Sequence, residues 1–347
     1  MGIKVLVVDD SATARAILKE ILLSDKEIES VDTAPDAYIA RDKIVKNPPD
    51  VICLDVEMPR MDGITFLKKL MLHMPLPVIM VSSLTQKGAE TTLEALESGA
   101  VDFVAKPHTN IYDGAQEMEK ELLEKVKNSA FVNVADFKVK KVYKHLNYHN
   151  HLKETTQKLI VVGASTGGVE ALKEFLMQFP RNTPGMLIVQ HMPANFTKQF
   201  AKRLNGLCEM DIKEAEDGDV VTIGQVLLAP GDKHMVLRHS GNRYYIQIGG
   251  GEKVSGHRPS VDVMFNSVSK SAGANAVGVI LTGMGSDGAN GLLNMREAGS
   301  MTFGQDEKSS VVYGMPRVAN EIGGVVQERS LEKLPMSILH YLEKIKV

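Results

Sequence analysis

The chain has 347 residues, more than one hydrophobic core usually organises, so we expect two domains. Hydrophobic residues make up 44% and charged residues 24%, as in ordinary globular proteins, and no stretch reaches the roughly 20 apolar residues that span a bilayer. The formal net charge of −3 excludes a global basic footprint for nucleic acid, and Cys53 and Cys208 follow no metal-binding or redox pattern.

The chain starts with a short apolar run that ends in two carboxylates, MGIKVLVVDD, which predicts a first strand rather than a secretory signal. We therefore expect a cytoplasmic protein with no direct insertion into a membrane. Further apolar runs lie at 30–33, 51–54, 78–81 and 102–105, with amphipathic stretches between them. Ser11 is a predicted helix N-cap, and Gly99 ends a helical pattern. This alternation predicts a five-stranded, parallel, doubly wound α/β domain over residues 1–123.

Polar side chains collect where these strands end. Asp9 and Asp10 end the first strand, Asp55 ends the third, Ser82 follows the fourth and Lys106 follows the fifth. In a parallel sheet these ends share one edge, so the three carboxylates would repel one another unless a hard cation such as Mg²⁺ neutralised them. Lys106 adds a compact cation suited to a phosphoryl oxygen.

Residues 124–157 break the alternation and carry seven lysines against three acidic residues, so we expect an interdomain linker. Two interpretations stay open for its basic character: a solvated spacer, or a docking segment. His145, His149 and His151 lie in this linker without cysteine or carboxylate partners, which disfavours a metal site.

The second half, residues 158–347, returns to alternating strands and helices. Strands are expected at 159–163, 186–190 and 276–281, and helices at 169–177 and 196–204. The run QVLLAPGDKHMVLRHSGNRYYIQIGGG contains several strand-like segments separated by turn residues, which predicts an antiparallel insertion. The second domain is therefore expected to be Rossmann-like α/β with an antiparallel β insertion.

Ser165 lies in KLIVVGASTGG, where small residues permit a tight turn between a strand and a helix, which is a suitable place for a nucleophile. A serine needs a base, and His191 follows the next strand at the same sheet edge, whereas His234 and His239 flank a predicted hairpin strand. Asp287, after a further strand, would orient the imidazole; its alternative role is to cap the helix that starts near residue 288.

The short pattern GASTG matches G-x-S-x-G, but the order Ser165, His191, Asp287 differs from that of α/β-hydrolases, so that fold is not assigned. Turns of small residues also bind nucleotide phosphates, and this alternative stays open. It is weakened because the segment has neither the spaced dinucleotide glycines nor a Walker lysine.

The motifs of the first domain resemble the response-regulator receiver family over about 120 residues: DD after the first strand, DVEMPRMDG after the third, VSS after the fourth and KP after the fifth. The serine at the fourth strand replaces the commoner threonine and keeps the hydroxyl. The resemblance implies a phosphoacceptor, Asp55; Mg²⁺ ligands, Asp9, Asp10, Asp55 and the backbone carbonyl of Glu57; phosphoryl contacts, Ser82 and Lys106; and a switch aromatic, Phe103.

The motifs IVVGASTGG, IVQHMP, LLAPGDKHM, SGHRPSVD and LTGMGSDGA resemble the catalytic domain of the chemotaxis protein-glutamate methylesterases, the CheB family. The resemblance implies that Ser165 is the nucleophile, His191 the general base and acid, and Asp287 its orienting carboxylate, with the backbone amide of Met284 as oxyanion donor. Thr166, His257 and Arg258 are placed at the substrate cleft; for His257 and Arg258, an exposed pair at a helix terminus is the alternative.

The family also implies the reaction and its partners. The substrate would be a glutamate γ-methyl ester on the cytoplasmic domain of a chemoreceptor, giving glutamate and methanol, and the same acyl chemistry would deamidate receptor glutamine. A histidine kinase would phosphorylate Asp55, and the unmodified receiver would obstruct the catalytic cleft. No cofactor is expected for the ester hydrolysis.

Two output functions of other classes compete with this hypothesis. One is a receiver that controls a non-catalytic, nucleotide-sensing domain. The other is a DNA-binding response regulator, which is disfavoured because the second half lacks a basic recognition helix and is larger than a simple helix-turn-helix output.

Overall fold

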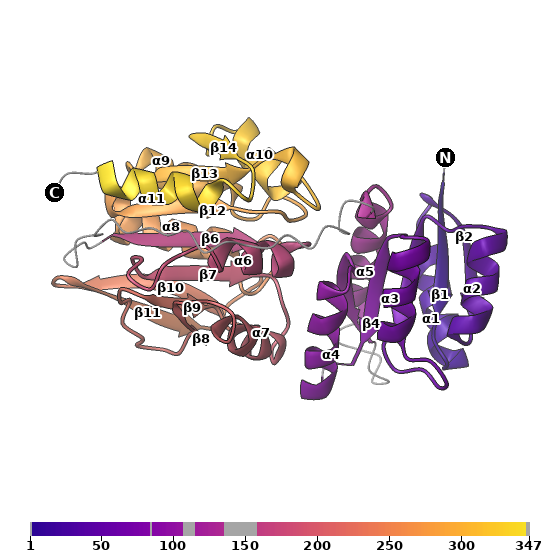
Figure 1. Cartoon of the computed structure of the whole chain (residues 1–347). Coiled ribbons are helices and arrows are strands. Elements are labelled where there is room, and N and C mark those ends of the chain that lie inside the picture. The colour runs from indigo at the N-terminus through magenta and orange to yellow at the C-terminus, as the bar shows by residue number, and fades with distance from the viewer. Residues whose placement is uncertain (1, 84, 107–114, 135–157, 345–347) are drawn as a thin grey trace. The chain divides into compact units, whose positions relative to one another are not determined.

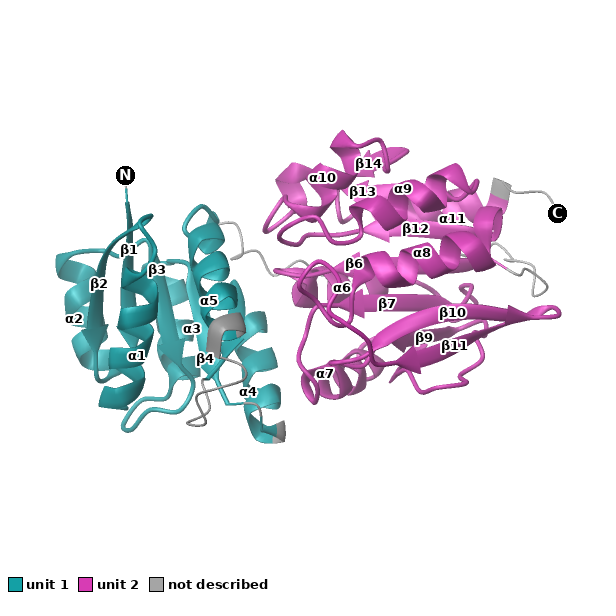
Figure 2. Cartoon of the chain, turned by 180° about the vertical axis from the view of Figure 1, so that it is seen from behind, with its two compact units in different colours: residues 1–141 teal, residues 142–347 magenta. Residues whose placement is uncertain are grey.

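The computed structural model describes residues 2–83, 85–106, 115–134 and 158–344. The chain divides into two compact units, residues 1–141 and 142–347 (Figure 2). Each unit has its own buried apolar core. Most of the expected linker, including His145, His149 and His151, lies outside the described residues.

The first unit contains a five-stranded parallel sheet with the strand order β2-β1-β3-β4-β5 (Figure 1). Buried apolar side chains along the central strands form the core with the inner faces of the helices. The fold therefore confirms the expected doubly wound domain. Its elements, in chain order, are β1 (Ile3–Val8), α1 (Ala12–Leu23), β2 (Ile28–Ala34), α2 (Ala37–Lys46), β3 (Val51–Asp55), α3 (Gly63–His73), β4 (Val78–Ser82), α4 (Gln86–Glu97), β5 (Asp102–Ala105) and α5 (Ala115–Ser129).

Local capping agrees with the sequence at the start of α1, where the Ser11 side chain accepts a hydrogen bond from the backbone N–H of Ala14. The end of the first unit differs from the expectation. Helix α5 continues to Ser129, six residues beyond 123, because Leu122 and Val126 are fully buried on one helical face against the sheet. The alternation of strand and helix thus continues past Glu124, where the linker was expected to begin.

The second unit contains a seven-stranded sheet in the order β14-β13-β12-β6-β7-β9-β8, in which all paired strands run parallel. Its elements are β6 (Leu159–Ala164), α6 (Gly168–Leu176), β7 (Met186–Gln190), α7 (Phe196–Asn205), β8 (Asp211–Glu214), β9 (Gln225–Leu228), β10 (His234–Ser240), β11 (Arg243–Gly249), α8 (Val261–Ser271), β12 (Ala276–Ile280), α9 (Ala289–Glu297), β13 (Met301–Gln305), α10 (Met315–Glu321), β14 (Gln327–Arg329) and α11 (Leu334–Lys344).

Helices cover both faces of this sheet. Helices α6 and α11 contact each other on one face, whereas on the other face α8 contacts both α9 and strand β10 of the hairpin (Figures 1 and 2). Val161 and Leu187 of the sheet, Phe265 of α8 and Leu237 and Ile246 of the hairpin belong to one buried cluster. The hairpin therefore helps to close the core under α8.

The expected antiparallel insertion is present as the β10–β11 pair. One part of the expectation is corrected: the first strand-like segment of that run, β9, pairs in parallel with β7 and β8 and so belongs to the main sheet. A continuous run of strand-forming residues does not reveal which partner each strand will choose. Among the described residues, no helix is long and apolar enough to cross a membrane.

Candidate functional site

The three candidate residues of the second unit follow three neighbouring strands. Ser165 follows β6, His191 follows β7, and Asp287 lies in the loop after β12. The sheet order places β6 between β7 and β12: the chain continues from β6 to β7 and β9 on one side and later adds β12 and β13 on the other. Such a switch point opens a crevice at the carboxyl ends of the strands, where ligands bind in doubly wound sheets. The topology therefore brings these residues together.

The side chains form a continuous hydrogen-bonded line. His191 Nδ1 lies 3.1 Å from Ser165 Oγ, and His191 Nε2 lies 2.8 Å from Asp287 Oδ2. Because a carboxylate oxygen only accepts, Nε2 carries the proton, which leaves Nδ1 free to accept from the serine hydroxyl. This arrangement has the distances and the roles of a Ser-His-Asp triad.

Asp287 is buried, with only 1% of its side chain exposed, at the N-terminus of α8. Its Oδ1 accepts from Ser260 Oγ (2.8 Å) and its Oδ2 from the backbone N–H of Val261 (2.7 Å). Burial alone would raise the pKa of this carboxyl, but the hydrogen bonds from His191, Ser260 and Val261 outweigh it and hold the pKa below the ordinary value. The carboxylate is thus kept ionised beside the imidazole.

The alternative role of Asp287, as a cap of the following helix, is wrong in this form. Helix α9 begins at Ala289 after Gly288, which makes no side-chain capping bond. Asp287 instead caps the neighbouring helix α8, while Asp262 in the first turn of α8 accepts from the backbone N–H of Gly291 in α9 (2.6 Å). The two helices therefore exchange capping carboxylates, and this exchange fixes the position of Asp287.

The turn that carries Ser165 is held by its own backbone. The carbonyl oxygen of Ser165 accepts from the N–H of Gly168 (2.7 Å) and from Gln190 Nε2 (2.9 Å). Gly167 has φ of +76°, a conformation that favours glycine, and any Cβ there would meet the side chain of Val311. The small residues noted in the sequence thus permit both the turn and the close approach of neighbouring side chains.

Gly168→Ala is expected to lower the rate of reaction at Ser165 by about 10²-fold, because a small displacement of a reacting group has an effect of that order. A methyl group at position 168 would lie 2.0 Å from Gln190 Oε1, so the amide that holds the Ser165 carbonyl must move. Overpacking of this kind also destabilises by about 1–3 kcal/mol. Labelling of Ser165 by a small serine-directed phosphonate, together with thermal unfolding, measures both effects.

The matched control is Gly206→Ala at the exposed end of α7, where the nearest atom to an added Cβ lies at an ordinary 3.5 Å. Its labelling rate should equal that of the wild type. A Gly168→Ala variant that reacts as fast as this control would show that the Gln190 contact does not position the nucleophile.

Met284, expected to supply an oxyanion-binding amide, lies in the loop after β12 and is partly buried. The loop is tied to a later segment, residues 311–315: the N–H of Gly283 donates to Val312, and the carbonyl of Gly283 accepts from Met315. Thr282, fully buried, accepts from the N–H of Val312 and donates to the Thr166 carbonyl, both at 3.0 Å. One threonine hydroxyl thus joins the Met284 loop to the turn that carries Ser165.

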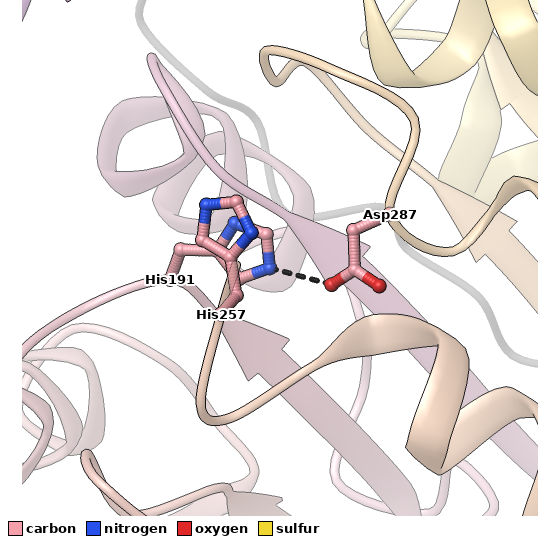
Figure 3. A group of neighbouring side chains, drawn as sticks. All are labelled: His191, His257 and Asp287. Atoms are coloured by element: carbon pink, nitrogen blue, oxygen red, sulfur yellow. Dashed lines mark hydrogen bonds and ion pairs between the residues drawn. The ribbon is translucent and has the colours of Figure 1, made fainter. Parts of the chain in front are cut away.

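The three residues expected at the substrate cleft have different surroundings. Thr166 is buried, with 5% exposed, so its side chain offers little surface to a substrate. His257 lies directly on His191, with the ring centroids 3.8 Å apart and the planes inclined by 9° (Figure 3). Arg258 donates to the carbonyl oxygen of Gly251. His257 therefore contacts the candidate base His191 directly. Neither role expected from the sequence, substrate contact or an exposed pair at a helix terminus, included this contact.

The other two histidines considered as bases, His234 and His239, have different surroundings. His234 is buried at 6% exposure, where Nδ1 accepts from the N–H of Ser260 and Nε2 pairs with the carbonyl oxygen of Glu252. His239 is exposed on β10. Among the described residues, Ser165 Oγ forms a hydrogen bond with His191 and with neither of these histidines, so the geometry favours His191 as the base.

His191, His257 and Asp287 also place potential ligand atoms within 4.8 Å of one another. The nitrogen lone pairs of two stacked rings lie in nearly parallel planes, however, so they do not converge on one point. A metal at about 2.0–2.1 Å from both rings would require the stack to open. The geometry accordingly fits proton transfer better than metal binding.

The first unit brings its own candidate residues together at the carboxyl edge of its sheet. Asp9, Asp10 and Asp55 each offer a carboxylate oxygen within 4.8 Å of the others. Lys106 Nζ lies 2.7 Å from Asp55 Oδ2 and 3.1 Å from Asp9 Oδ2. Burial lowers the pKa of the Lys106 ammonium, but these two ion pairs outweigh it and raise that pKa above its usual value.

The raised pKa of the Asp55 carboxyl indicates that a cation would stabilise its ionised form. Burial and the nearby charge of Asp9 raise the pKa of the Asp55 carboxyl to about 6, although Lys106 opposes this shift. A set of three carboxylates is the hard oxygen donor set that Mg²⁺ prefers, so these residues fit the expected ion. Glu57, two residues beyond Asp55, is exposed in the following loop, and its backbone N–H donates to Asp55 Oδ1 at 3.3 Å.

Ser82 and Phe103 complete the expected set. Ser82 ends β4 with 1% exposed, and its carbonyl accepts from the N–H of Lys106. Phe103 is buried at 4% exposure, and Lys125 Nζ lies 5.1 Å from the centre of its ring. The expected switch aromatic is therefore packed inward in this structure.

Several supporting residues were missed by the sequence analysis: Gln190, Asp262, Thr282 and segment 311–315. Ser260 caps α8, since its Oγ accepts from the N–H of Val263. The same hydroxyl also donates to Asp287. The proximity of polar residues to strand ends was the available signal for Gln190 and Thr282, but it does not reveal their partners.

Comparisons with known proteins agree over both units. Residues 160–338 match the family model described as CheB methylesterase, and residues 5–112 match the response regulator receiver domain. The protein-glutamate methylesterase/protein-glutamine glutaminase of Sulfurimonas denitrificans is 56% identical across the full length of both chains. The protein of the same name from Escherichia coli K12 is 52% identical over 97% of this chain and 96% of its own.

A solved structure supports the fold of the second unit. The crystal structure of the Thermotoga maritima CheB methylesterase catalytic domain is 34% identical, covers 53% of this chain and 98% of that domain, and gives a TM-score of 0.52.

Proposed function

The chain belongs to the CheB methylesterase family, and from this premise we propose that Ser165, His191 and Asp287 carry out its ester hydrolysis. It is a protein-glutamate methylesterase and protein-glutamine glutaminase whose receiver domain makes it subject to regulation by phosphorylation. The observation that carries the residue assignment is the line of hydrogen bonds from Ser165 Oγ through His191 to Asp287.

In the first half of the reaction, Ser165 Oγ attacks the γ-carbonyl carbon of a methylated glutamate while its proton passes to His191 Nδ1. The imidazolium that forms is stabilised by Asp287 at Nε2. The oxyanion is placed at the backbone N–H of Met284, on the loop that Thr282 ties to the Ser165 turn. His191 then returns the proton to the departing methoxide, and methanol leaves.

In the second half, a water molecule attacks the acyl-enzyme as His191 Nδ1 accepts its proton, and the serine leaves with that proton restored. The products are the receptor glutamate and free Ser165. With a glutamine side chain, the same steps release ammonia in place of methanol, which accounts for the glutaminase activity.

The first unit supplies the control. We assign Asp55 as the phosphoacceptor, with Lys106 and Ser82 contacting the phosphoryl group and Asp9, Asp10 and the Glu57 carbonyl completing an Mg²⁺ site with Asp55. When bound, Mg²⁺ would neutralise the carboxylates and the phosphoryl oxygens. The cluster of carboxylates within 4.8 Å and the Lys106 ion pairs support this assignment.

The partners follow from the reaction. Methylated cytoplasmic domains of chemoreceptors are the proposed substrates in chemotactic adaptation, a histidine kinase is the proposed phosphodonor, and a cytoplasmic location suits both. The linker's role stays open between a spacer and a docking segment. A nucleotide-sensing output is disfavoured, because the turn after β6 directs Ser165 to an imidazole and a carboxylate.

The test is release of methanol from a methylated receptor by the full chain, with and without Mg²⁺ and a phosphoryl analogue such as beryllium fluoride. We expect release in both conditions and a faster rate with the analogue. Tight nucleotide binding without methanol release would contradict the proposal and favour a sensing domain.

Asp55→Asn is expected to remove the activation and leave the basal rate. A coupling free energy between two sites typically corresponds to a factor of roughly 5 to 150, and we expect activation of that order to be lost because the amide cannot accept the phosphoryl group. The matched control is Asp42→Asn at an exposed position of α2, which should keep the activation. Equal activation of wild type and Asp55→Asn would sink the assignment of the phosphoacceptor.

A further inference from the structure

The rings of His191 and His257 stack on each other within the site, and the reaction scheme gives this contact no role. The two rings are nearly parallel, 3.8 Å apart, and come from different segments: His191 follows β7, and His257 lies between β11 and α8 (Figure 3). Only 8% of the His191 side chain is exposed. One face of the catalytic imidazole is therefore covered by a second imidazole.

His257 is held in place before any substrate arrives. It ends a two-residue turn that starts at Val254, and the backbones of these two residues exchange hydrogen bonds of 2.9 and 3.1 Å. The central residues, Ser255 and Gly256, both have positive φ, of 53° and 80°, as such turns require. His257 Nδ1 lies 2.8 Å from the carbonyl oxygen of Ser255, so this nitrogen carries a proton and the plane of the ring is set.

The same segment also holds the other partner of His191. Three residues after His257, Ser260 Oγ donates to Asp287 Oδ1, and the N–H of Val261 donates to Asp287 Oδ2. Arg258 between them is anchored on both sides, since its side chain donates to Gly251 and its carbonyl accepts from the N–H of Asp232. Segment 254–261 thus fixes both the plane of the stacked ring and the carboxylate.

These contacts complement each other geometrically. Hydrogen bonds at Nδ1 and Nε2 hold the two ends of the His191 ring, but the ring can still rock about the line that joins Ser165 to Asp287. The terminal torsion of histidine is broad, so little else opposes this motion. A ring packed flat against one face restricts it. When His191 becomes an imidazolium in the transition state, the aromatic face of His257 also stabilises the new charge.

We propose that His257 is a positioning residue for the general base: its ring, stacked on His191, holds the imidazole in the plane that joins Ser165 to Asp287. This inference rests on the proposed function of Ser165 and His191. It differs from the role expected from the sequence, in which His257 contacts the substrate at the cleft. The two roles predict different results with a small reagent that touches no receptor-binding surface.

The experiment compares three variants of the full chain: His257→Phe keeps an aromatic ring, His257→Gln keeps a donor for the Ser255 carbonyl without a ring, and His257→Ala keeps neither. The first readout is the second-order rate at which a small fluorophosphonate labels Ser165 without receptor. The second is kcat and KM for methanol release from methylated receptor. Circular dichroism and thermal unfolding establish that each variant is folded.

We expect the alanine and glutamine variants to lose about 30-fold in the labelling rate and in kcat, with KM unchanged, which is the size of a desolvated cation–π contact. The phenylalanine variant should remain within about threefold of wild type in both, because the stacked face is restored. If alanine does not fold, the comparison of glutamine with phenylalanine decides alone.

Two results would overturn the proposal. Unchanged labelling with a raised KM in all three variants would assign His257 to substrate contact. Equal loss in the phenylalanine and glutamine variants would show that the aromatic face is not what matters. If the proposed function itself were wrong, wild type and Ser165→Ala would be labelled at the same rate, whatever residue occupies position 257.

Discussion

Ser165→Ala is expected to lower kcat for methanol release from methylated receptor by a factor on the order of 10⁶, close to complete loss. The alanine has no oxygen to form the acyl-enzyme, and within the described part of the chain Ser165 Oγ is the only nucleophile that forms a hydrogen bond with His191 Nδ1. The residual rate would come only from oxyanion stabilisation and substrate binding. Gas chromatography of methanol from a methylated receptor, at saturating receptor, measures kcat directly.

The matched control for this substitution is Ser269→Ala, which removes a hydroxyl from α8 that donates only to the carbonyl of Asn266 at 2.9 Å. It should hydrolyse the ester at the wild-type rate. The expected loss concerns chemistry rather than folding, since Ser165 is only partly buried and its backbone carries the contacts that hold the turn. Retention of more than a few per cent of activity by Ser165→Ala would exclude it as nucleophile.

Asp287→Asn is expected to lower kcat by about 10⁴-fold, the effect of presenting the wrong hydrogen-bonding group to a catalytic histidine. In the native site, donors approach both carboxylate oxygens: Ser260 Oγ at Oδ1, and Val261 N–H and His191 Nε2–H at Oδ2. An amide has one oxygen, so whichever way it turns, its NH₂ group faces a donor. With the NH₂ group in the place of Oδ2, His191 adopts the other tautomer and loses its acceptor at Nδ1, and the N–H of Val261 also loses its acceptor. With the NH₂ group in the place of Oδ1, His191 keeps its tautomer and the N–H of Asp262 loses its acceptor at the N-terminus of α8.

The two orientations can be distinguished by measurement. Loss of a capping bond of α8 lowers the free energy of unfolding by about 0.5–2 kcal/mol in both orientations, whereas kcat and the labelling rate of Ser165 fall only where the His191 tautomer changes. Asp219→Asn is a suitable control, because that carboxylate also accepts from a backbone N–H, of Glu216, and pairs with Lys213 outside the site. A kcat within tenfold of wild type for Asp287→Asn would show that the carboxylate does not orient His191.

The sequence-based expectations agree best with the structure where the position of a residue follows directly from topology. Each strand end of a parallel sheet faces the same edge, so Asp9, Asp55 and Lys106 could be assigned to one site from their positions after apolar runs. The distances of 2.7 and 3.1 Å from Lys106 to the two carboxylates agree with this expectation. Ser165, His191 and Asp287 were identified by the same reasoning in the second unit.

The expectations failed for strands whose sequence does not indicate the neighbouring strand with which they pair. Strands β8 (Asp211–Glu214) and β14 (Gln327–Arg329) were not predicted, because they are short edge strands with mostly polar residues and no apolar alternation. The parallel pairing of β9 was mistaken for part of the hairpin, since strand propensity does not specify a neighbour. Helix α5 runs past the expected boundary at 123, because it buries one apolar stripe through a charged sequence.

The sequence by itself determined which groups we propose to react: a serine, a histidine and an aspartate at three strand ends, and a cluster of carboxylates with a lysine at the edge of the other sheet. Side-chain chemistry and the position of a residue at the end of an apolar run are local enough to be encoded in short motifs. Only the tertiary structure decided how these groups are held. Asp287 caps α8 rather than its own helix, and His257 lies flat on His191, because the long connection through β10 and β11 brings segment 254–261 back to the sheet edge. Contacts between segments so distant in sequence depend on packing, which no local pattern specifies.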